Sequence, residues 1–411
     1  MRDERGLFGL IPHSSFLIPR LGLVAAGLLL PLLALEIAFR LFGPFLPGNY
    51  DTGAYLVRHP RYGHYHPPNY DGWIKRDEYV VHVQTNVEGQ RGPPVPLEKP
   101  PDTVRILALG DSFVEAVQVA EHERFLARLD ALLNTSDTRQ RFELIDGGCG
   151  GWGTVQEYLY LKDQGPRYQP DLVLLVFFVG NDVANNSLDL ELDGRIDVAL
   201  KPYFKRTAGG QLELLDPRPP PPTGTERAAL LLRRQSTVYN VVESGVLQKL
   251  SLDDLWSAWR DLDALRELND PSRDVFQVRM DARWREAWAI TDTLMGMARD
   301  EATAQGSRFG LVVVPTRSQT SREAWRELAG PDEGRRLGLD PTQPNALLVG
   351  IAARTSTPVL DLSPFFREAS ATSGQAPLYF ARDQHWTAAG HALAARAIAD
   401  FVSRLTQDRD P

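Results

Sequence analysis

The stretch RILALGDSFVEAVQV, residues Arg105–Val119, changes character near its middle. Its first part is an apolar run typical of a buried β-strand, and the run stops at Gly110, Asp111 and Ser112, after which the spacing of apolar residues becomes helical. The stretch therefore predicts a strand, a tight turn and a helix, with a serine in the turn. A serine in that place lies at the carboxyl end of a strand, where open α/β sheets bind their ligands.

The alternation of strand and helix continues along the chain. Short apolar runs predict strands at 104–110, 142–148, 170–180, 308–316 and 357–363. Apolar residues at helical spacing predict helices at 122–134, 154–165, 282–306 and 387–405. The run PDLVLLVFFVG is apolar throughout, as expected of a parallel strand that is covered on both faces. Strands that alternate with helices predict an α/β fold with a central parallel sheet.

Four polar segments lie at the ends of these strands or just before the last helix. They are Gly110–Ser112, Asp146–Thr154 with the sequence DGGCGGWGT, Gly180–Asp182, and Asp383–Trp386 with the sequence DQHW. Each alone has a simple structural explanation, such as a helix cap or a tight turn. Because the carboxyl ends of parallel strands meet at one edge of the sheet, their joint placement predicts a single cleft.

The residues in this predicted cleft suit acyl transfer through a serine. A serine hydroxyl needs a neighbouring base to take its proton, and His385 is the candidate base. Asp383 lies two positions earlier, so in an extended loop its carboxylate points to the same side and reaches the imidazole Nδ1–H. A tetrahedral intermediate also needs hydrogen-bond donors for its oxyanion. The Ser112 N–H, a glycine N–H of the second segment and the Asn181 side-chain amide are the candidate donors.

These motifs resemble the SGNH/GDSL hydrolase superfamily. GDSF, a Gly-rich second block, GND and Asp-x-His occur in the order of that family, and the stretch TNVEGQRG before the first block is similar to its membrane-anchored bacterial members. The resemblance implies a flavodoxin-like three-layer sandwich and no cofactor or metal. It also implies that Ser112 is the nucleophile, that Asp383 and His385 activate it, and that Ser112, Gly151 and Asn181 form the oxyanion hole.

Three features depart from the common family pattern. The first block reads GDSFV rather than GDSL, and one residue instead of two separates Asp383 from His385. The DQHW spelling is similar to the Asp-x-His-Trp of alginate O-acetylation proteins, whose members are acetyltransferases, but in those the serine follows the Asp-His pair. Several glycines crowd the 148–153 loop, so the sequence leaves open which of them donates to the oxyanion.

The N-terminal part is strongly apolar. Residues 21–46 form an apolar run whose first half, LGLVAAGLLLPLLAL, has no charged residue. The charged residues of its second half are Glu36 and Arg40, which we expect to form an ion pair one helical turn apart. About 20 residues suffice to span a bilayer. Because no small-x-small cleavage site ends the run, we predict an uncleaved transmembrane anchor over 21–46 after a short tail, 1–20, rather than a signal peptide. A short tail is easily left in the cytoplasm, which places the following domain on the periplasmic or extracytoplasmic side of the bacterial inner membrane.

Residues 47–103 are rich in Pro, Tyr and His and predict an irregular arm with one or two strands. His59, His64 and His66 suggest a metal site, but the interleaved prolines and tyrosines fix no ligand geometry, so no metal is predicted. The arm would be a spacer to the hydrolase domain at 104–405. Within that domain, 183–275 shows no evident strand and predicts an insertion or lid, with a stiff proline run in the middle.

Other polar and aromatic residues near the predicted cleft have structural explanations. We expect Asp111 and Asp182 to stabilise their turns and Cys149 to pack rather than react. Trp152 and Trp386 flank the cleft, where they either stack on a sugar ring or pack in the core.

Net charge and motifs together define the predicted function. The chain has a formal charge of −8 and no dense Lys/Arg block, which argues against nucleic acid as a partner. The first hypothesis is a membrane-anchored esterase that cleaves acyl esters, most plausibly O-acetyl, on an envelope or secreted glycan. The second is a polysaccharide O-acetyltransferase that takes the acyl group from a multispanning membrane partner. The third is a non-catalytic envelope or glycan-binding protein.

Overall fold

The computed structural model describes residues 14–42, 45, 48–135, 140–192, 201–207, 209–216, 223–243, 270–372, 374 and 376–407. Its centre is a five-stranded parallel sheet in the order β12-β11-β8-β6-β7. The strands are β6 (Thr103–Gly110), β7 (Arg141–Gly148), β8 (Leu172–Phe178), β11 (Arg308–Val314) and β12 (Val359–Asp361). Each lies within or over one of the five apolar runs, so the predicted parallel α/β sheet is confirmed.

The strand order explains where a site can form. If the five strands are numbered by their order in the chain, their order across the sheet is 2-1-3-4-5, which is the flavodoxin-like arrangement. Between β6 and β8 the connections turn to opposite sides of the sheet, and such switch points open a crevice at the carboxyl ends of the strands. Ser112 follows β6 and Asn181 follows β8, so both flank this crevice.

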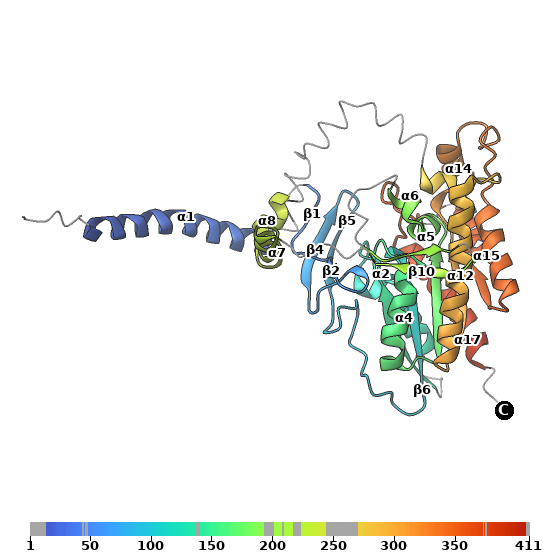
Figure 1. The fold of residues 1–411 in the computed structure, drawn as a ribbon. Coiled ribbons are helices and arrows are strands. Elements are labelled where there is room, and N and C mark those ends of the chain that lie inside the picture. The colour runs from blue at the N-terminus through green and yellow to red at the C-terminus, as the bar shows by residue number, and fades with distance from the viewer. Residues whose placement is uncertain are drawn as a thin grey trace, which may run out of the picture.

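Helices cover both faces of the sheet, giving three layers (Figure 1). One face packs on α4 (Thr154–Tyr168), α12 (Ala282–Ala304) and α15 (Gln343–Arg354); the other packs on α3 (Phe125–Leu133), α16 (Ser363–Ala371) and α17 (Ala388–Gln407). In β6, Leu107 and Leu109 enter the first core, while Ile106 and Ala108 enter the second. All residues of β6 are buried, which is why this strand reads as a continuous apolar run.

Short helices occupy the connections. They are α2 (Ser112–Glu115), η2 (Glu121–Glu123), α5 (Asp182–Asn185), α6 (Leu188–Leu192), α11 (Pro271–Asp274), α13 (Arg317–Thr320) and α14 (Arg322–Ala329).

The arm is more regular than the sequence predicts. It contains β1 (Tyr50–Asp51), β2 (Val57–His59), β3 (Gly63–Tyr65), β4 (Asp71–Arg76) and β5 (Tyr79–Gln84), arranged as the antiparallel sheets β1-β4-β5 and β2-β3. Its Tyr62 and Tyr65 belong to the same core as Trp152. Strands β1, β2 and β3, with two or three residues each, are too short to show alternation in the sequence.

The insertion contains a hairpin that the sequence analysis did not predict. Strands β9 (Tyr203–Arg206) and β10 (Leu212–Leu215) pair with each other outside the central sheet. Helices α7 (Gly224–Gln235) and α8 (Thr237–Val242) lie at the end of α1 (Ser14–Phe42), and α8 contacts both α1 and β1 (Figure 1). The proline run at 217–222 and the segments 193–200 and 244–269 fall outside the described residues.

The helix α1 occupies most of the predicted anchor at 21–46; residues 43, 44 and 46 fall outside the described part of the chain. Glu36 accepts a hydrogen bond from Arg40 Nε at 2.8 Å, the predicted pair. It also accepts the Thr237 N–H at 2.8 Å, which joins α1 to α8. A search of the described residues finds no helix with the length and apolarity needed to cross a membrane.

Candidate active site

The turn after β6 places Ser112 at the first position of α2. Asp111 caps this helix by accepting the Phe113 N–H at 2.9 Å, as expected of a residue that stabilises the turn. A Cβ on Gly110 would lie 2.4 Å from Val114 Cγ2 and 2.9 Å from the Val176 carbonyl oxygen, so the turn accepts only glycine there.

Ser112, His385 and Asp383 lie in hydrogen-bonding order. The Ser112 Oγ is 2.7 Å from His385 Nε2, and His385 Nδ1 is 2.6 Å from Asp383 Oδ1. A carboxylate can only accept, so Nδ1 carries the hydrogen and Nε2 is left to accept the serine hydroxyl. The structure therefore brings together the three residues that the sequence selected, across 273 positions.

The route by which Asp383 reaches His385 differs from the predicted extended loop. Gln384, between them, has a φ of +65°, in the left-handed region. The Phe380 N–H donates to the His385 carbonyl at 2.9 Å, and Tyr379 forms a bridge with Trp386, so the segment is a closed turn. A turn of this kind brings the two side chains together as an extended loop would.

The electrostatics of the pair favour a carboxylate facing a basic imidazole. Burial alone would raise the pKa of Asp383, but hydrogen bonds from His385 and Tyr79 and the attraction of the imidazolium hold this pKa below its ordinary value. Burial alone would lower the pKa of His385, but the hydrogen bond and charge of Asp383 raise it above its ordinary value. His385 is thus made a stronger base than a free histidine.

Asn181 lies beside this pair at the end of β8. It lines a cavity of about 510 Å³ together with Asp383 and His385. Its side-chain amide also hydrogen-bonds the Asp111 carboxyl, whose pKa burial raises to about 6. One N–H of an amide group bound in this way stays available to a ligand.

The loop at 148–153 leaves one backbone amide unengaged. Five of its N–H groups have acceptors, namely the Asp146 carboxylate, the Gly110 carbonyl, the Glu115 carboxylate, the Cys149 carbonyl and the Gln156 side chain. The sixth, of Gly151, has no acceptor within the described part of the chain, and its φ of +75° favours glycine. Gly151 is not among the described residues that line the cavity, so its predicted place in the oxyanion hole stays a prediction.

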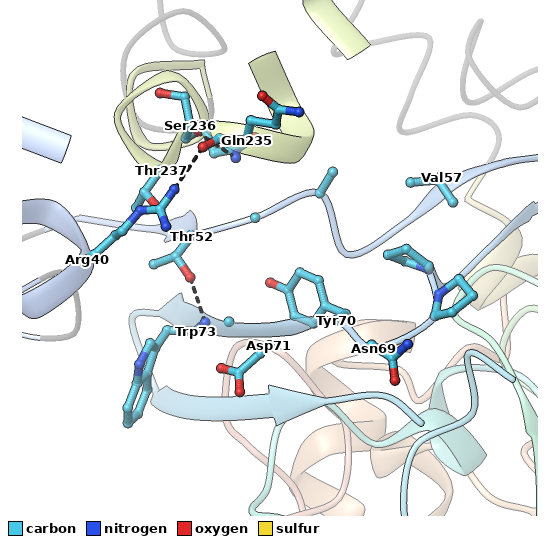
Figure 2. A pocket seen from close by; sticks show the side chains of 16 residues that line it. Arg40, Thr52, Val57, Asn69, Tyr70, Asp71, Trp73, Gln235, Ser236 and Thr237 are labelled. Atoms are coloured by element: carbon cyan, nitrogen blue, oxygen red, sulfur yellow. Dashed lines mark hydrogen bonds between the residues drawn. The ribbon is translucent and has the colours of Figure 1, made fainter. Parts of the chain in front are cut away.

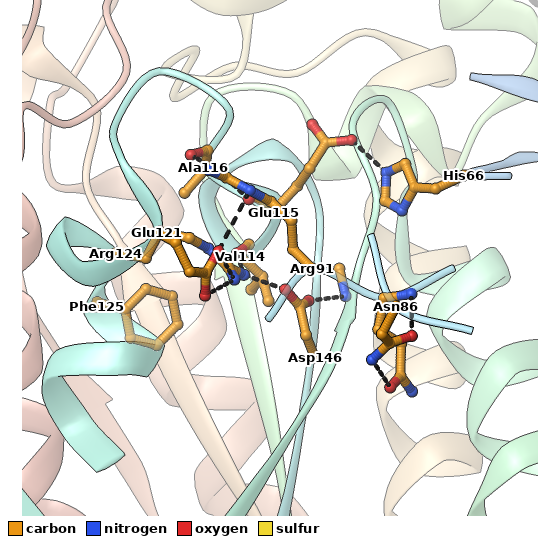
Figure 3. Close-up of polar contacts among 12 residues, drawn as sticks. His66, Asn86, Arg91, Val114, Glu115, Ala116, Glu121, Arg124, Phe125 and Asp146 are labelled. Atoms are coloured by element: carbon orange, nitrogen blue, oxygen red, sulfur yellow. Dashed lines mark hydrogen bonds and ion pairs between the residues drawn. The ribbon is translucent and has the colours of Figure 1, made fainter. Parts of the chain in front are cut away.

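One group in the described part of the chain has the composition of a metal site. The ligand atoms of His66, Glu115 and Cys149 lie within 4.8 Å of one another, all buried. Figure 3 shows the contact between His66 and Glu115. However, His66 binds Glu115 Oε1 at 2.6 Å through Nε2 and the Gly89 carbonyl at 3.0 Å through Nδ1, and Glu115 also accepts the Gly150 N–H. These partners satisfy an ion pair without a metal, so we assign none.

The three histidines considered in the sequence as a metal group have separate partners. His59 Nδ1 accepts the N–H groups of Arg61 and Tyr62 at 3.3 Å. His64 Nε2 is 2.8 Å from the Gly150 carbonyl, so His64 binds the loop at 148–153 rather than the other histidines.

Three acidic side chains, those of Asp111, Glu157 and Asp182, are buried and interact with one another. Burial and mutual repulsion raise the pKa values of Glu157 and Asp182 well above their ordinary values, with Asp111 as the shared neighbour. Asp182 still accepts the Phe178 N–H at 2.7 Å, which fits its predicted structural role. Both carboxyl oxygens of Glu157 lack a hydrogen-bond partner among the described residues. A buried carboxyl with no partner is held in the neutral form.

The tryptophans and the cysteine belong to the core. Trp152 and Trp386 are both 0% exposed, so neither can stack on a sugar. Burial raises the pKa of the Cys149 thiol well above its ordinary value, which leaves it unreactive.

A second cavity, of about 670 Å³, lies between α1, α8 and the β1-β4 part of the arm (Figure 2). Arg40, which lines it, donates to the Gln235 carbonyl at 2.8 Å. None of the predicted site residues is among the described residues that line this cavity. Asn181, Asp383 and His385 instead line the cavity of about 510 Å³.

The sequence of residues 274–411 matches the family of the SGNH hydrolase-like domain of the acetyltransferase AlgX. The match covers about a third of the chain, in which Asp383 and His385 lie, whereas Ser112 lies before it. The resemblance that the motifs indicated is thus confirmed.

Solved structures that are similar to this chain include esterases. An acetyl xylan esterase, AlAXEase, is 13% identical with a TM-score of 0.38 and covers 73% of this chain and 100% of its own. A catalytic mutant of Axe2, an acetylxylan esterase from Geobacillus stearothermophilus, is 14% identical with a TM-score of 0.38, covering 72% and 93%. A lipase/acylhydrolase from Enterococcus faecalis is 13% identical with a TM-score of 0.37, covering 74% and 96%. TM-scores this low carry no argument about the site. No curated protein matches the chain.

The sequence analysis missed the arm residues that contact the site. Glu78 and Tyr79 bind the turn that bears Asp383, and Tyr79 is 304 positions away from it. A contact over such a distance leaves no periodic signal in the chain.

Proposed function

We propose that this protein is a serine esterase that removes acyl groups, O-acetyl in particular, from a glycan. The observation that carries the proposal is the hydrogen-bonded series Ser112–His385–Asp383, with distances of 2.7 and 2.6 Å. An SGNH hydrolase-like domain with this site supports an ester-acting hydrolase or an acetyltransferase.

The geometry fits a two-step reaction. His385 Nε2 takes the hydroxyl proton while Ser112 Oγ bonds to the ester carbonyl carbon, and the carbonyl oxygen becomes the oxyanion. The Ser112 N–H and the Asn181 amide, with the Gly151 N–H as the predicted third donor, would stabilise this charge. The C–O bond to the sugar then breaks, and His385 returns its proton to the leaving sugar oxygen. Water, activated by the same imidazole, releases the acid from Ser112.

The lining of the cavity supports a short acyl group on a polar alcohol. The cavity of about 510 Å³ is lined by the aromatic residues Phe113 and Phe178 and by the hydroxyl-bearing residues Thr316 and Ser318. Small pockets that combine apolar walls with a few polar groups typically bind such ligands.

Transfer to a glycan hydroxyl is the second candidate. It is favoured by the family match, whose description names an acetyltransferase, and by the DQHW spelling at the site. A sugar hydroxyl would then take the place of the deacylating water, and a multispanning membrane partner would supply the acyl group. The intact contacts among Ser112, His385 and Asp383 argue against a protein that only binds glycans.

Intact-mass analysis of the full chain in detergent with 4-nitrophenyl acetate tests the proposal. We expect an acetyl adduct and nitrophenol release, both absent from Ser112→Ala. Added oligosaccharides then separate the two candidates, because transfer gives acetylated oligosaccharide whereas hydrolysis gives acetate alone. Wild-type protein without adduct or turnover would contradict an acyl-serine mechanism.

We also propose that residues 21–46 anchor the domain in the inner membrane, with the catalytic part outside the cytoplasm. The support is the apolar run in the sequence and the exposure of its leucines, such as Leu23 at 73% and Leu41 at 65%. Extraction of membranes with alkaline carbonate should leave the protein in the pellet, and external protease should digest it in spheroplasts. Release by carbonate or protection from protease would overturn this proposal.

A further inference from the structure

The turn that bears Asp383 is held from outside the central domain. Glu78 lies in the turn between β4 and β5, and its Oε1 accepts the Ala381 N–H at 2.8 Å. Its Oε2 accepts the N–H groups of Arg382 at 2.9 Å and Asp383 at 2.7 Å. The Glu78 carboxylate therefore accepts hydrogen bonds from three consecutive backbone amides. Hydrogen bonds to a charged acceptor are stronger than hydrogen bonds between neutral groups.

The next arm residue binds the carboxylate itself. The Tyr79 hydroxyl donates to Asp383 Oδ2 at 3.0 Å, while Oδ1 faces His385. The Tyr79 ring also packs on Phe380, with 5.4 Å between ring centroids. The two carboxylate oxygens are thus bound on opposite sides, which fixes the rotation of the group toward the imidazole.

These contacts add to the hydrogen bonds within the turn, in which the Phe380 N–H donates to the His385 carbonyl. Arg382 and Gln384 are exposed, and Gln384 has a left-handed φ of +65°. A non-glycine residue persists in this region only where the surrounding structure fixes it. Glu78 supplies that restraint.

We propose that Glu78 and Tyr79 are positioning residues for catalysis, Glu78 by fixing the backbone of the Asp383 turn and Tyr79 by orienting the Asp383 carboxylate toward His385. The proposal rests on the proposed esterase function. Through these two residues the arm completes the active site, so it does more than separate the domain from α1.

The test compares Tyr79→Phe, Glu78→Ala and Glu78→Gln in the full chain. Asp71→Asn is the matched control, because Asp71 accepts two hydrogen bonds of 2.7 Å on the same hairpin but contacts only His82 and Gln84. The measurements are kcat and KM for 4-nitrophenyl acetate, the rate of Ser112 labelling by a fluorophosphonate, and the melting temperature.

We expect the loss to appear in kcat, with KM unchanged. Tyr79→Phe should lower kcat about tenfold, as for one lost hydrogen bond to a charged group, and Glu78→Ala about 10²-fold, as for a displaced catalytic group. Glu78→Gln, which keeps one acceptor oxygen, should lie between wild type and Glu78→Ala. Asp71→Asn should match wild type.

The pH profile distinguishes positioning from a structural effect. Without the Tyr79 hydroxyl the Asp383 carboxylate should stabilise the imidazolium more strongly, so the pKa of His385, and with it the acid limb of kcat/KM, should move to higher pH. The other charged groups acting on the pair, Asp111 and Arg76, are unchanged in the variant. A purely structural defect would lower activity equally at every pH.

The outcomes separate the two proposals. A wild-type protein that neither hydrolyses the ester nor reacts with the fluorophosphonate would overturn the esterase function. An active wild type with Tyr79→Phe unchanged in kcat and pH profile would overturn the positioning role. If Glu78→Ala melts early, Tyr79→Phe, which removes only one oxygen, decides the question.

Discussion

At the scale of single residues, His385 connects the two other members of the series. Its Nδ1 faces a carboxylate and its Nε2 faces a hydroxyl, at 2.6 and 2.7 Å. Removal of either neighbour therefore changes the basicity of the ring as well as its orientation.

The first prediction concerns the pH dependence of turnover. His385 must be neutral to accept the serine proton, and Asp383 raises its pKa above the ordinary 6.5. Activity should therefore rise with pH through a pKa above 6.5. In Asp383→Asn the acid limb should move to lower pH and kcat should fall about 10³–10⁴-fold. Initial rates from pH 5 to 9 check both expectations, and an unshifted acid limb in Asp383→Asn would contradict the role of the carboxylate.

The second prediction concerns the buried Glu157. Its carboxyl is neutral in the folded protein because burial raises the pKa well above the ordinary 4.5, but it ionises on unfolding. Above pH 4.5 the unfolded state thus binds fewer protons, and stability falls by up to about 1.4 kcal/mol per pH unit. Glu157→Gln keeps the shape and removes this slope, so its melting temperature should exceed that of wild type at pH 7 but not at pH 4.

Thermal melts of both proteins from pH 4 to 8 measure the effect. Glu323→Gln, at an exposed position of α14, is the control and should leave the slope unchanged. A wild-type melting temperature that rises from pH 5 to 7 in parallel with Glu157→Gln would show that Glu157 is ionised in the folded protein.

At the scale of elements, the approach of β7 to α2 positions the nucleophile. A Cβ on Gly148 would lie 2.5 Å from Val114 Cβ and 2.8 Å from the Glu115 nitrogen. Since Ser112 begins α2, any displacement of this helix moves its hydroxyl relative to His385. A displacement of about 1 Å is enough to lower a rate about 10²-fold.

The third prediction compares two glycines. Gly148→Ala should lower both the melting temperature and kcat, because α2 has to move away from β7. Gly296→Ala, in the middle of α12 with open space around it, should instead stabilise the protein by about 0.5–1 kcal/mol and leave kcat unchanged. Denaturant unfolding and turnover measured on both variants check this, and equal effects would contradict the close contact.

The elements that the sequence predicted are those with one dominant pattern. Strands β6 and β8 are buried on both faces, so they read as continuous apolar runs. The long helix α12 shows its pattern over many turns. Strands β9 and β10 have only four residues each, and buried and exposed positions do not alternate in either of them, so no strand pattern can be recognised.

The sequence indicated the candidate-site residues that follow strands or lie at a regular spacing, but not those that the arm contributes. Ser112 and Asn181 end strands, and the topology of a parallel sheet fixes where strand ends meet. Asp383 and His385 were found by their spacing, although the turn between them is left-handed rather than extended. Glu78 and Tyr79 were not found, because their contacts depend on how the arm packs against the sheet, which no local pattern encodes.

At the scale of the whole molecule, a continuous set of contacts leads from α1 to the site. Glu36 of α1 caps α8, α8 packs on β1, and β1 pairs with β4, whose turn to β5 carries Glu78. Helix α1 contacts α8 and, through Arg40, the Gln235 carbonyl at the end of α7. We therefore expect the two N-terminal parts of the chain to affect catalysis differently, because the arm binds the Asp383 turn whereas α1 binds α8.

The fourth prediction follows from this difference. A chain that begins at Gly48 should keep the kcat/KM of the full chain toward 4-nitrophenyl acetate, since Glu78 and Tyr79 remain. A chain that begins at Thr103 should lose activity even where its domain stays folded, because the Asp383 turn is no longer held. Circular dichroism and fluorophosphonate labelling of both truncations distinguish loss of positioning from loss of fold. Full activity in a folded chain that begins at Thr103 would show that the sheet alone places Asp383, and would reduce the arm to the spacer that its composition suggests.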